Sequence, residues 1–227
     1  MNYSIKTLKN GLRAIAARRH HTDLCAIALL VRAGGRYDGQ LKVPFGTAHF
    51  VEHLLFRSCR KRSSDSIYKV IESYGGKIDA GTTREYALVQ VTVPSANFEK
   101  ALEVIRDIVS FPSFNNADLK DEAEIIKGEI TREKDRFSVV WNLFFRTLWT
   151  KHPFRDSILG SEKEIENITL KDVRKFYGRC YSAKNMVLSV ASRFEPEYVQ
   201  EKASKIFGGL RAGKKINPAA VKEPPQA

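Results

Sequence analysis

The sequence predicts an α+β domain, a mostly antiparallel sheet of about five to six strands with helices packed on one face. Strand-like segments occur in two groups separated by pairs of helical segments, and neighbouring strands are joined by hairpin turns, which disfavours a doubly wound parallel sheet. The chain has 227 residues, 43% of them hydrophobic and 28% charged. This composition excludes a disordered chain, and the absence of an apolar run of about eighteen residues excludes a membrane-spanning helix.

The predicted strands follow from alternation and turn residues. Residues 3–8 and 12–18 alternate around Asn10-Gly11, which favours a tight hairpin because both residues tolerate positive φ. Residues 24–33 are largely apolar and end at Gly34-Gly35, as expected of a more buried strand. Residues 77–82, 85–93 and 185–192 are three further strands, and Pro94 ends the second of these.

Helical periodicity and end signals predict the helices. Thr47 is a candidate N-cap for a helix over residues 48–57, and Gly75-Gly76 ends a helix over 64–74. Further helices are expected over 96–110, 117–135, 138–150, 162–167, 170–181 (capped by Thr169) and 196–207. We therefore predict one domain over residues 1–210. Residues 211–227 contain Pro218, Pro224 and Pro225 and are predicted to be a linker or tail.

The net charge of +12 is concentrated near the N-terminus. Residues 1–63 hold twelve Lys or Arg against three acids, which accounts for nine of the twelve charges. Such a region can bind phosphates, acidic peptides or an acidic partner, or it can be a solvated basic surface. No aromatic-interleaved RNA motif or Cys/His finger accompanies the charge, so a nucleic-acid partner ranks last.

The cysteines and the first residues of the chain indicate the cellular compartment in which the protein is expected. Cys25, Cys59 and Cys180 are odd in number and widely separated, which indicates reduced thiols rather than a disulfide framework. The first residues lack the basic, apolar and small-residue regions of a secretory signal, so a cytoplasmic location is expected.

The segment His49-Phe50-Val51-Glu52-His53 carries the most specific chemistry. On a helix, positions three and four residues apart share a face, so both imidazoles and the carboxylate project together. Two imidazoles one turn apart can bind one Zn²⁺, and a neighbouring carboxylate can act as general base toward a water molecule. The alternative is a pair of surface histidines on an amphipathic helix. The strongly apolar flanks disfavour that alternative, because burying unliganded polar groups is costly.

A catalytic zinc site needs a third protein ligand. The predicted helix over 117–135 offers Glu122, Glu124, Glu129 and Glu133, and periodicity alone does not choose among them. Glu122 and Glu129 are seven residues apart and share a face, so one can bind the metal while the other supports a ligand. A solvated helix face is the alternative for each of these carboxylates.

Beyond these residues, the chain resembles a known family. Residues 46–56, GTAHFVEHLLF, resemble the active-site helix of the pitrilysin-type inverted-zincin metallopeptidases, which carry a His-x-x-Glu-His motif. Residues 71–86 resemble the family's edge-strand segment, and residues 151–160 resemble a later signature. The likeness covers about residues 3–210 and is to the N-terminal, zinc-bearing half, similar to bacterial processing-peptidase-like proteins.

The resemblance implies a zinc endopeptidase with Zn²⁺ as cofactor. It implies that His49, His53 and Glu129 bind the metal, that Glu52 is the catalytic base and that Glu122 supports the metal site. It further implies that an extended peptide substrate adds to the edge strand containing Asp79, Ala80, Gly81 and Thr82. The family usually has Asn at the position of Asp79, and the extra negative charge is expected to alter substrate contacts.

The resemblance also implies partners. Family members build a closed chamber from repeated domains, so we expect a peptide or unfolded protein substrate and a homologous second domain or subunit, in a homo-oligomer or hetero-oligomer. Neither a membrane nor nucleic acid is expected as a partner. A non-catalytic interaction subunit that keeps the peptidase fold is the competing hypothesis. Acidic or neutral peptides are the expected substrates, since the first quarter of the chain is basic.

Other noticeable residues have structural explanations. His20 and His21 are expected to be solvated, and His152, which precedes Pro153, is expected to cap or pack a helix end. Trp141, Phe144 and their aromatic neighbours occur at helical spacing and are expected in the core or in an interdomain contact.

Overall fold

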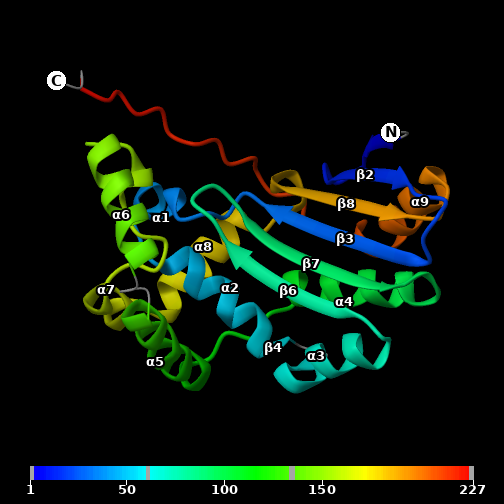
Figure 1. Cartoon of the computed structure of the whole chain (residues 1–227), viewed down its shortest axis with the longest axis horizontal. Coiled ribbons are helices and arrows are strands. Elements are labelled where there is room, and N and C mark those ends of the chain that lie inside the picture. The colour runs from blue at the N-terminus through cyan, green and yellow to red at the C-terminus, as the bar shows by residue number, and fades with distance from the viewer. Residues whose placement is uncertain (1–2, 60–61, 133–135, 225–227) are drawn as a thin grey trace.

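A computed structural model describes residues 3–59, 62–132 and 136–224, and its centre is a six-stranded sheet in the order β1-β2-β8-β3-β7-β6 (Figure 1). The strands are β1 (Tyr3–Thr7), β2 (Arg13–Arg18), β3 (Leu24–Val31), β6 (Lys77–Thr82), β7 (Ala87–Pro94) and β8 (Met186–Ser192). All neighbouring strands are antiparallel except β2 and β8, which run parallel. The predicted fold class is confirmed.

Helices cover one face of this sheet. Alternate residues of β3, β7 and β8 are buried while the residues between them are partly or fully exposed, as expected when only one face is covered. The helices are α1 (Arg36–Leu41), α2 (Thr47–Arg57), α3 (Ser64–Ser73), α4 (Phe98–Ser110), α5 (Asn116–Arg132), α6 (Arg136–Leu148), α7 (Glu162–Asn167), α8 (Leu170–Cys180) and α9 (Pro196–Phe207). The short strands β4 (Ser58–Cys59) and β5 (Arg62–Ser63) pair separately.

Most predicted elements are found, with several local differences. The turn after β1 uses positive φ only at Gly11, and Asn10 instead accepts the Leu12 N–H and donates to the Phe207 carbonyl. Helix α1 was not predicted. The end of the expected helix over 117–135 lies outside the described residues, as does Glu133.

The cap of α2 differs from the prediction. Thr47 is the first residue of the helix, and its hydroxyl donates to the Pro44 carbonyl instead of accepting a helix N–H. The Asp38 carboxylate, from α1, accepts the N–H groups of Gly46 and Ala48 at 3.0 Å each. This side chain is 1% exposed. Burial raises the pKa of Asp38 well above its ordinary value, although the N–H donors of Ala48 and Gly46 lower it.

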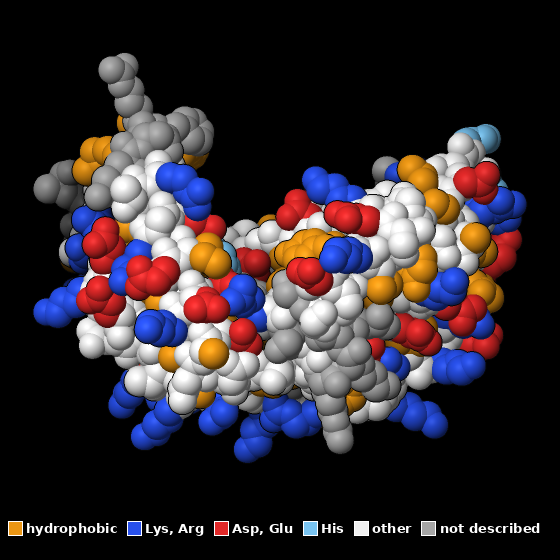
Figure 2. Space-filling view, turned by 90° about the horizontal axis from the view of Figure 1, so that it is seen from below, with side chains coloured by type: hydrophobic (Ala, Val, Ile, Leu, Met, Phe, Trp, Pro, Cys, Tyr) orange, Lys and Arg blue, Asp and Glu red, His pale blue; other side chains and the backbone are white. Residues whose placement is uncertain are grey.

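Helix α6 stands at one end of the molecule, next to a hollow that the space-filling view shows between this end and the body of the sheet (Figure 1, Figure 2). Trp141 and Phe144 are 46% and 49% exposed, so they do not lie in the core of this chain, and the alternative expectation of an interdomain contact stays a prediction. Val140 and Leu143 are exposed on the same helix.

The three cysteines are free and buried, in agreement with reduced thiols.

Residues 208–224 contain no helix or strand, yet they lie against the domain. Ile216 is buried, and its N–H donates to the Asn185 side chain. The Glu223 carboxylate accepts the backbone N–H groups of Thr150, Lys151 and His152. The predicted boundary near residue 211 stays a prediction.

Candidate metal centre

The residues predicted to bind a metal lie together between α2 and α5. Helix α2 presents His49, Glu52 and His53 on one side, and α5 packs against it with Glu129 facing both imidazoles. Glu129 Oε2 lies 3.8 Å from His49 Nε2 and 3.6 Å from His53 Nε2. One ligand atom from each of the three residues lies within 4.8 Å of the others, a spacing compatible with one shared ion.

The donor set also fits zinc chemically. Two imidazoles and one carboxylate, with a fourth position left open, are typical of catalytic zinc sites. Burial, with a smaller contribution from the neighbouring His53, lowers the pKa of His49 to about 3. His49 is therefore neutral near pH 7, the form that a metal ligand needs. Its Nδ1 is buried and has no hydrogen-bond partner among the described residues.

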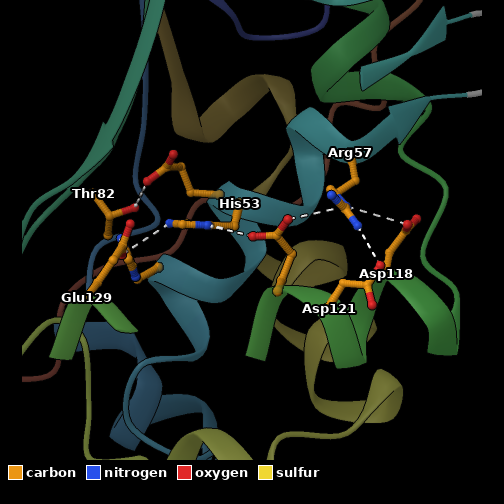
Figure 3. A network of polar contacts seen from close by, with 9 residues as sticks. His53, Arg57, Thr82, Asp118, Asp121 and Glu129 are labelled. Atoms are coloured by element: carbon orange, nitrogen blue, oxygen red, sulfur yellow. Dashed lines mark hydrogen bonds and ion pairs between the residues drawn. The ribbon is translucent and has the colours of Figure 1, made fainter. Parts of the chain in front are cut away.

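Glu122 orients the second imidazole. Its Oε2 lies 2.8 Å from His53 Nδ1, so His53 turns Nε2 toward Glu129, and Figure 3 shows His53 between these contacts. Burial lowers the pKa of His53, but the carboxylates of Glu122, Glu52 and Glu129 together raise it above its ordinary value. A carboxylate on the far nitrogen is a common way to fix the orientation of a ligating imidazole.

Arg57 extends this network and was not singled out from the sequence. Its Nε lies 3.2 Å from Glu122 Oε1 and 3.5 Å from Asp118 Oδ1, while Nη2 donates to Asp121 at 2.8 Å (Figure 3). The guanidinium thus fixes the oxygen of Glu122 that His53 does not use. Position 57 lies one helical turn after His53, but a sequence with many arginines gave no reason to choose this one.

Glu52 lies beside the cluster on the sheet side. Its side chain accepts the Thr82 hydroxyl at 3.2 Å, which joins α2 to the edge strand β6. Burial raises its pKa. His53 and the Thr82 hydroxyl lower it, and the negative charges of Glu129 and Asp79 raise it again. A carboxyl group with a raised pKa accepts a proton more readily near neutral pH.

The other candidates have different places. Glu124 lies on the outer side of α5, paired with Lys127 at 2.7 Å, so it does not join the cluster. The predicted substrate segment, Asp79 to Thr82, lies on β6 at the edge of the sheet, paired on one side with β7. A Cβ at Gly81 would meet no heavy atom within 4 Å, so the backbone is open to close approach there.

The three other histidines, His20, His21 and His152, lie outside the cluster. His20 and His21 are exposed, as predicted. The His152 side chain accepts the Phe154 N–H and caps the short helix over Pro153–Arg155, which confirms the capping prediction.

Comparison with known proteins defines the class. The model of the insulinase family, peptidase family M16, matches residues 13–162, and the model of the peptidase M16 inactive domain matches residues 167–227. The chain belongs to peptidase family M16, in agreement with the resemblance inferred from the sequence.

Individual relatives agree with this class. An uncharacterized zinc protease of Rickettsia bellii is 31% identical over 95% of this chain and 52% of its own length. Subunit 1 of the mitochondrial cytochrome b-c1 complex of Bos taurus is 28% identical over 91% of this chain and 42% of its own. The crystal structure of a protease from Helicobacter pylori superposes with a TM-score of 0.89 at 25% identity, covering 98% of this chain and 54% of that one.

The chain spans about half the length of these relatives. In the part of the chain that the structure describes, no helix combines the length and apolarity needed to cross a bilayer.

Proposed function

We propose that this chain is the zinc-bearing half of a metalloendopeptidase, with His49, His53 and Glu129 as metal ligands and Glu52 as general base. The observation that carries the proposal is the convergence of three ligand atoms within 4.8 Å beside a buried carboxylate. Bound Zn²⁺ would lower the pKa of a coordinated water to about 7 and polarise the substrate carbonyl.

The protein groups around the ligands support these roles. Glu122 accepts from His53 Nδ1 and leaves Nε2 directed toward Glu129, which supports its role as an orienting group. Thr82 holds Glu52 on the side of the cluster that faces β6. Glu52 would take a proton from the attacking water and return it to the leaving amine.

The edge strand β6 supports a binding mode for the substrate. An extended peptide can add to a free sheet edge through main-chain hydrogen bonds. Ala80 and Gly81 are small, and Thr82 links this edge directly to Glu52. Asp79 is exposed there, and its charge would disfavour acidic side chains at the nearest substrate positions, although the basic residues elsewhere favour acidic or neutral peptides.

A homologous second half is part of the proposal. The relatives are about twice as long as this chain, so a second domain or a partner subunit would complete the substrate chamber. A cytoplasmic location and an oligomeric assembly remain predictions.

The test combines metal analysis with turnover. The purified chain should bind about one zinc ion, and the double variant His49→Ala/His53→Ala should bind none while keeping its circular dichroism spectrum. Peptide hydrolysis should be measured for the chain alone and mixed with a homologous second half. Glu52→Gln should keep zinc but lose about 10²-fold or more in turnover. Unchanged zinc-dependent turnover in Glu52→Gln would show that Glu52 is not the base.

A non-catalytic subunit is the second candidate, because one relative is named as a subunit of the cytochrome b-c1 complex. In that case the folded chain would bind no zinc. The double variant would then match the unmodified chain in zinc content, circular dichroism and peptide hydrolysis.

A further inference from the structure

A cavity lies on the helical side of the domain, apart from the zinc ligands. It has a volume of about 610 Å³ and is formed where α4 ends, beside α8 and the segment after α9. Cavities of this size are in the range that holds small ligands in proteins. None of the residues assigned to the metal site (His49, Glu52, His53, Glu122 and Glu129) lines it.

The cavity combines an apolar wall with cations. Val109, Phe111, Tyr177, Ile206 and Leu210 provide aliphatic and aromatic surface. Arg106, Lys205 and Arg211 add three positive charges, and no acidic side chain among the described residues lines the cavity.

The three cations differ in how far they are already neutralised. Arg106 pairs with the buried Asp107 at 2.5 Å. Arg211 donates to the backbone carbonyl of Gly178, a neutral acceptor, so its charge is not compensated by that contact. Lys205 is exposed on the last turn of α9. Two cations are thus available to a negatively charged group at this site.

We propose that this cavity, with Lys205 and Arg211 beside its apolar lining, binds a single-chain amphipathic anion. The acidic head lies against the two cations, and the apolar chain lies against Val109, Tyr177 and Leu210. A carboxylate or a phosphate head satisfies the same cations, so a free fatty acid and a phosphate-headed lipid share this chemistry.

The experiment uses isothermal titration calorimetry on the purified chain with dodecanoate, dodecyl phosphate and the uncharged dodecanol, all below the concentrations at which they aggregate. At least one anion should bind about tenfold or more tightly than dodecanol, and the tighter anion identifies the preferred head. If neither anion binds, or if dodecanol binds equally well, the proposal is wrong.

Variants locate the binding. Lys205→Gln/Arg211→Gln should weaken anion binding about tenfold, whereas Lys171→Gln, an exposed cation of α8 outside the cavity lining, should not change it. Gly209→Phe should abolish binding, because Gly209 lines the cavity and a Cβ there meets nothing within 4 Å. Zinc content and circular dichroism should stay unchanged in all variants.

Exposed apolar residues on α6 are the alternative place for an alkyl chain. Val140→Ser, on that helix, should leave binding unchanged. Binding that survives Gly209→Phe, or that is lost in Val140→Ser, would overturn the assignment to this cavity.

Discussion

Asp38→Ala tests whether a buried carboxylate fixes the start of the helix that carries His49. Asp38 is 1% exposed and accepts two N–H groups at 3.0 Å, from Gly46 and Ala48. Removing it leaves both donors buried without a partner, and each hydrogen bond to a charged acceptor is worth about 1.5–3 kcal/mol. The variant also removes the cost of desolvating the charged carboxyl group, the cost that the raised pKa of Asp38 reflects, and this offsets part of the loss. We expect a net loss of about 2–4 kcal/mol in the free energy of unfolding.

The assay is urea unfolding of the metal-free chain followed by circular dichroism, with the m-value as a check that the same surface is exposed on unfolding. Asp172→Ala is the matched control. Its carboxylate accepts the Thr169 N–H and hydroxyl at the start of α8, but those hydrogen bonds are exposed to solvent. The control should lose only about 1 kcal/mol. If Asp38→Ala loses no more than Asp172→Ala, the buried cap is not what holds α2 in place.

Asp38→Asn separates charge from hydrogen bonding. The amide keeps one acceptor oxygen but turns a second donor toward a backbone N–H, so its loss should be smaller than that of Asp38→Ala. A loss equal to that of Ala would show that both hydrogen bonds need the carboxylate.

Three other perturbations have distinct expected results. Glu122→Gln should weaken zinc binding about 10-fold to 100-fold in a competition assay with a chelator, while the exposed Glu124→Gln should have no effect. Burial, with a smaller contribution from the charge of Asp38, raises the pKa of the Cys180 thiol to about 12. Because the folded state holds this proton more tightly, its contribution to stability is complete below pH 9 and is lost as the pH rises toward 12, by up to about 1.4 kcal/mol per pH unit. Cys180→Ala should show a shallower alkaline loss in urea titrations at pH 9 and 10.5, and equal slopes would refute the assignment. Gly46→Ala should lower the melting temperature by several degrees, because φ is +91° there and a Cβ would lie 2.6 Å from the Leu159 carbonyl oxygen; an unchanged value would mean that the loop adapts freely.

Local signals predicted most of the fold. Gly75, at φ +70°, ends α3 as expected of a helix-stopping glycine, and Thr169 caps α8 with a reciprocal bond from Asp172. The helix α1 was missed because its six residues include a central glycine and have no apolar periodicity. The cap supplied by Asp38 was missed for a related reason, since its acceptor comes from a different element than the helix it caps.

The part of the candidate site that lies on helix α2 could be predicted from the sequence. His49, Glu52 and His53 are local, and their spacing alone places them on one face. Which glutamate of α5 meets them depends on how α5 crosses α2, and periodicity left that choice open until family resemblance selected Glu129. Arg57, which fixes Glu122, depends on the same packing and had no local signal.

The exposure of α6 could not be predicted either. Trp141 and Phe144 have the spacing of a core-facing stripe, and a sequence does not say whether a partner surface lies within the same chain.

The position of β8 constrains the order in which the protein can assemble during synthesis. β8 lies between β2 and β3, so the N-terminal hairpin is joined to the remaining strands only when residues 186–192 have been made. Before that point β2 and β3 each expose an edge that can pair with another nascent chain. His49, His53 and Glu129 leave the ribosome well before the strand that completes their framework. A nascent chain should therefore bind metal weakly. Tight metal binding is expected only after β8 has paired with β2 and β3 and completed the sheet.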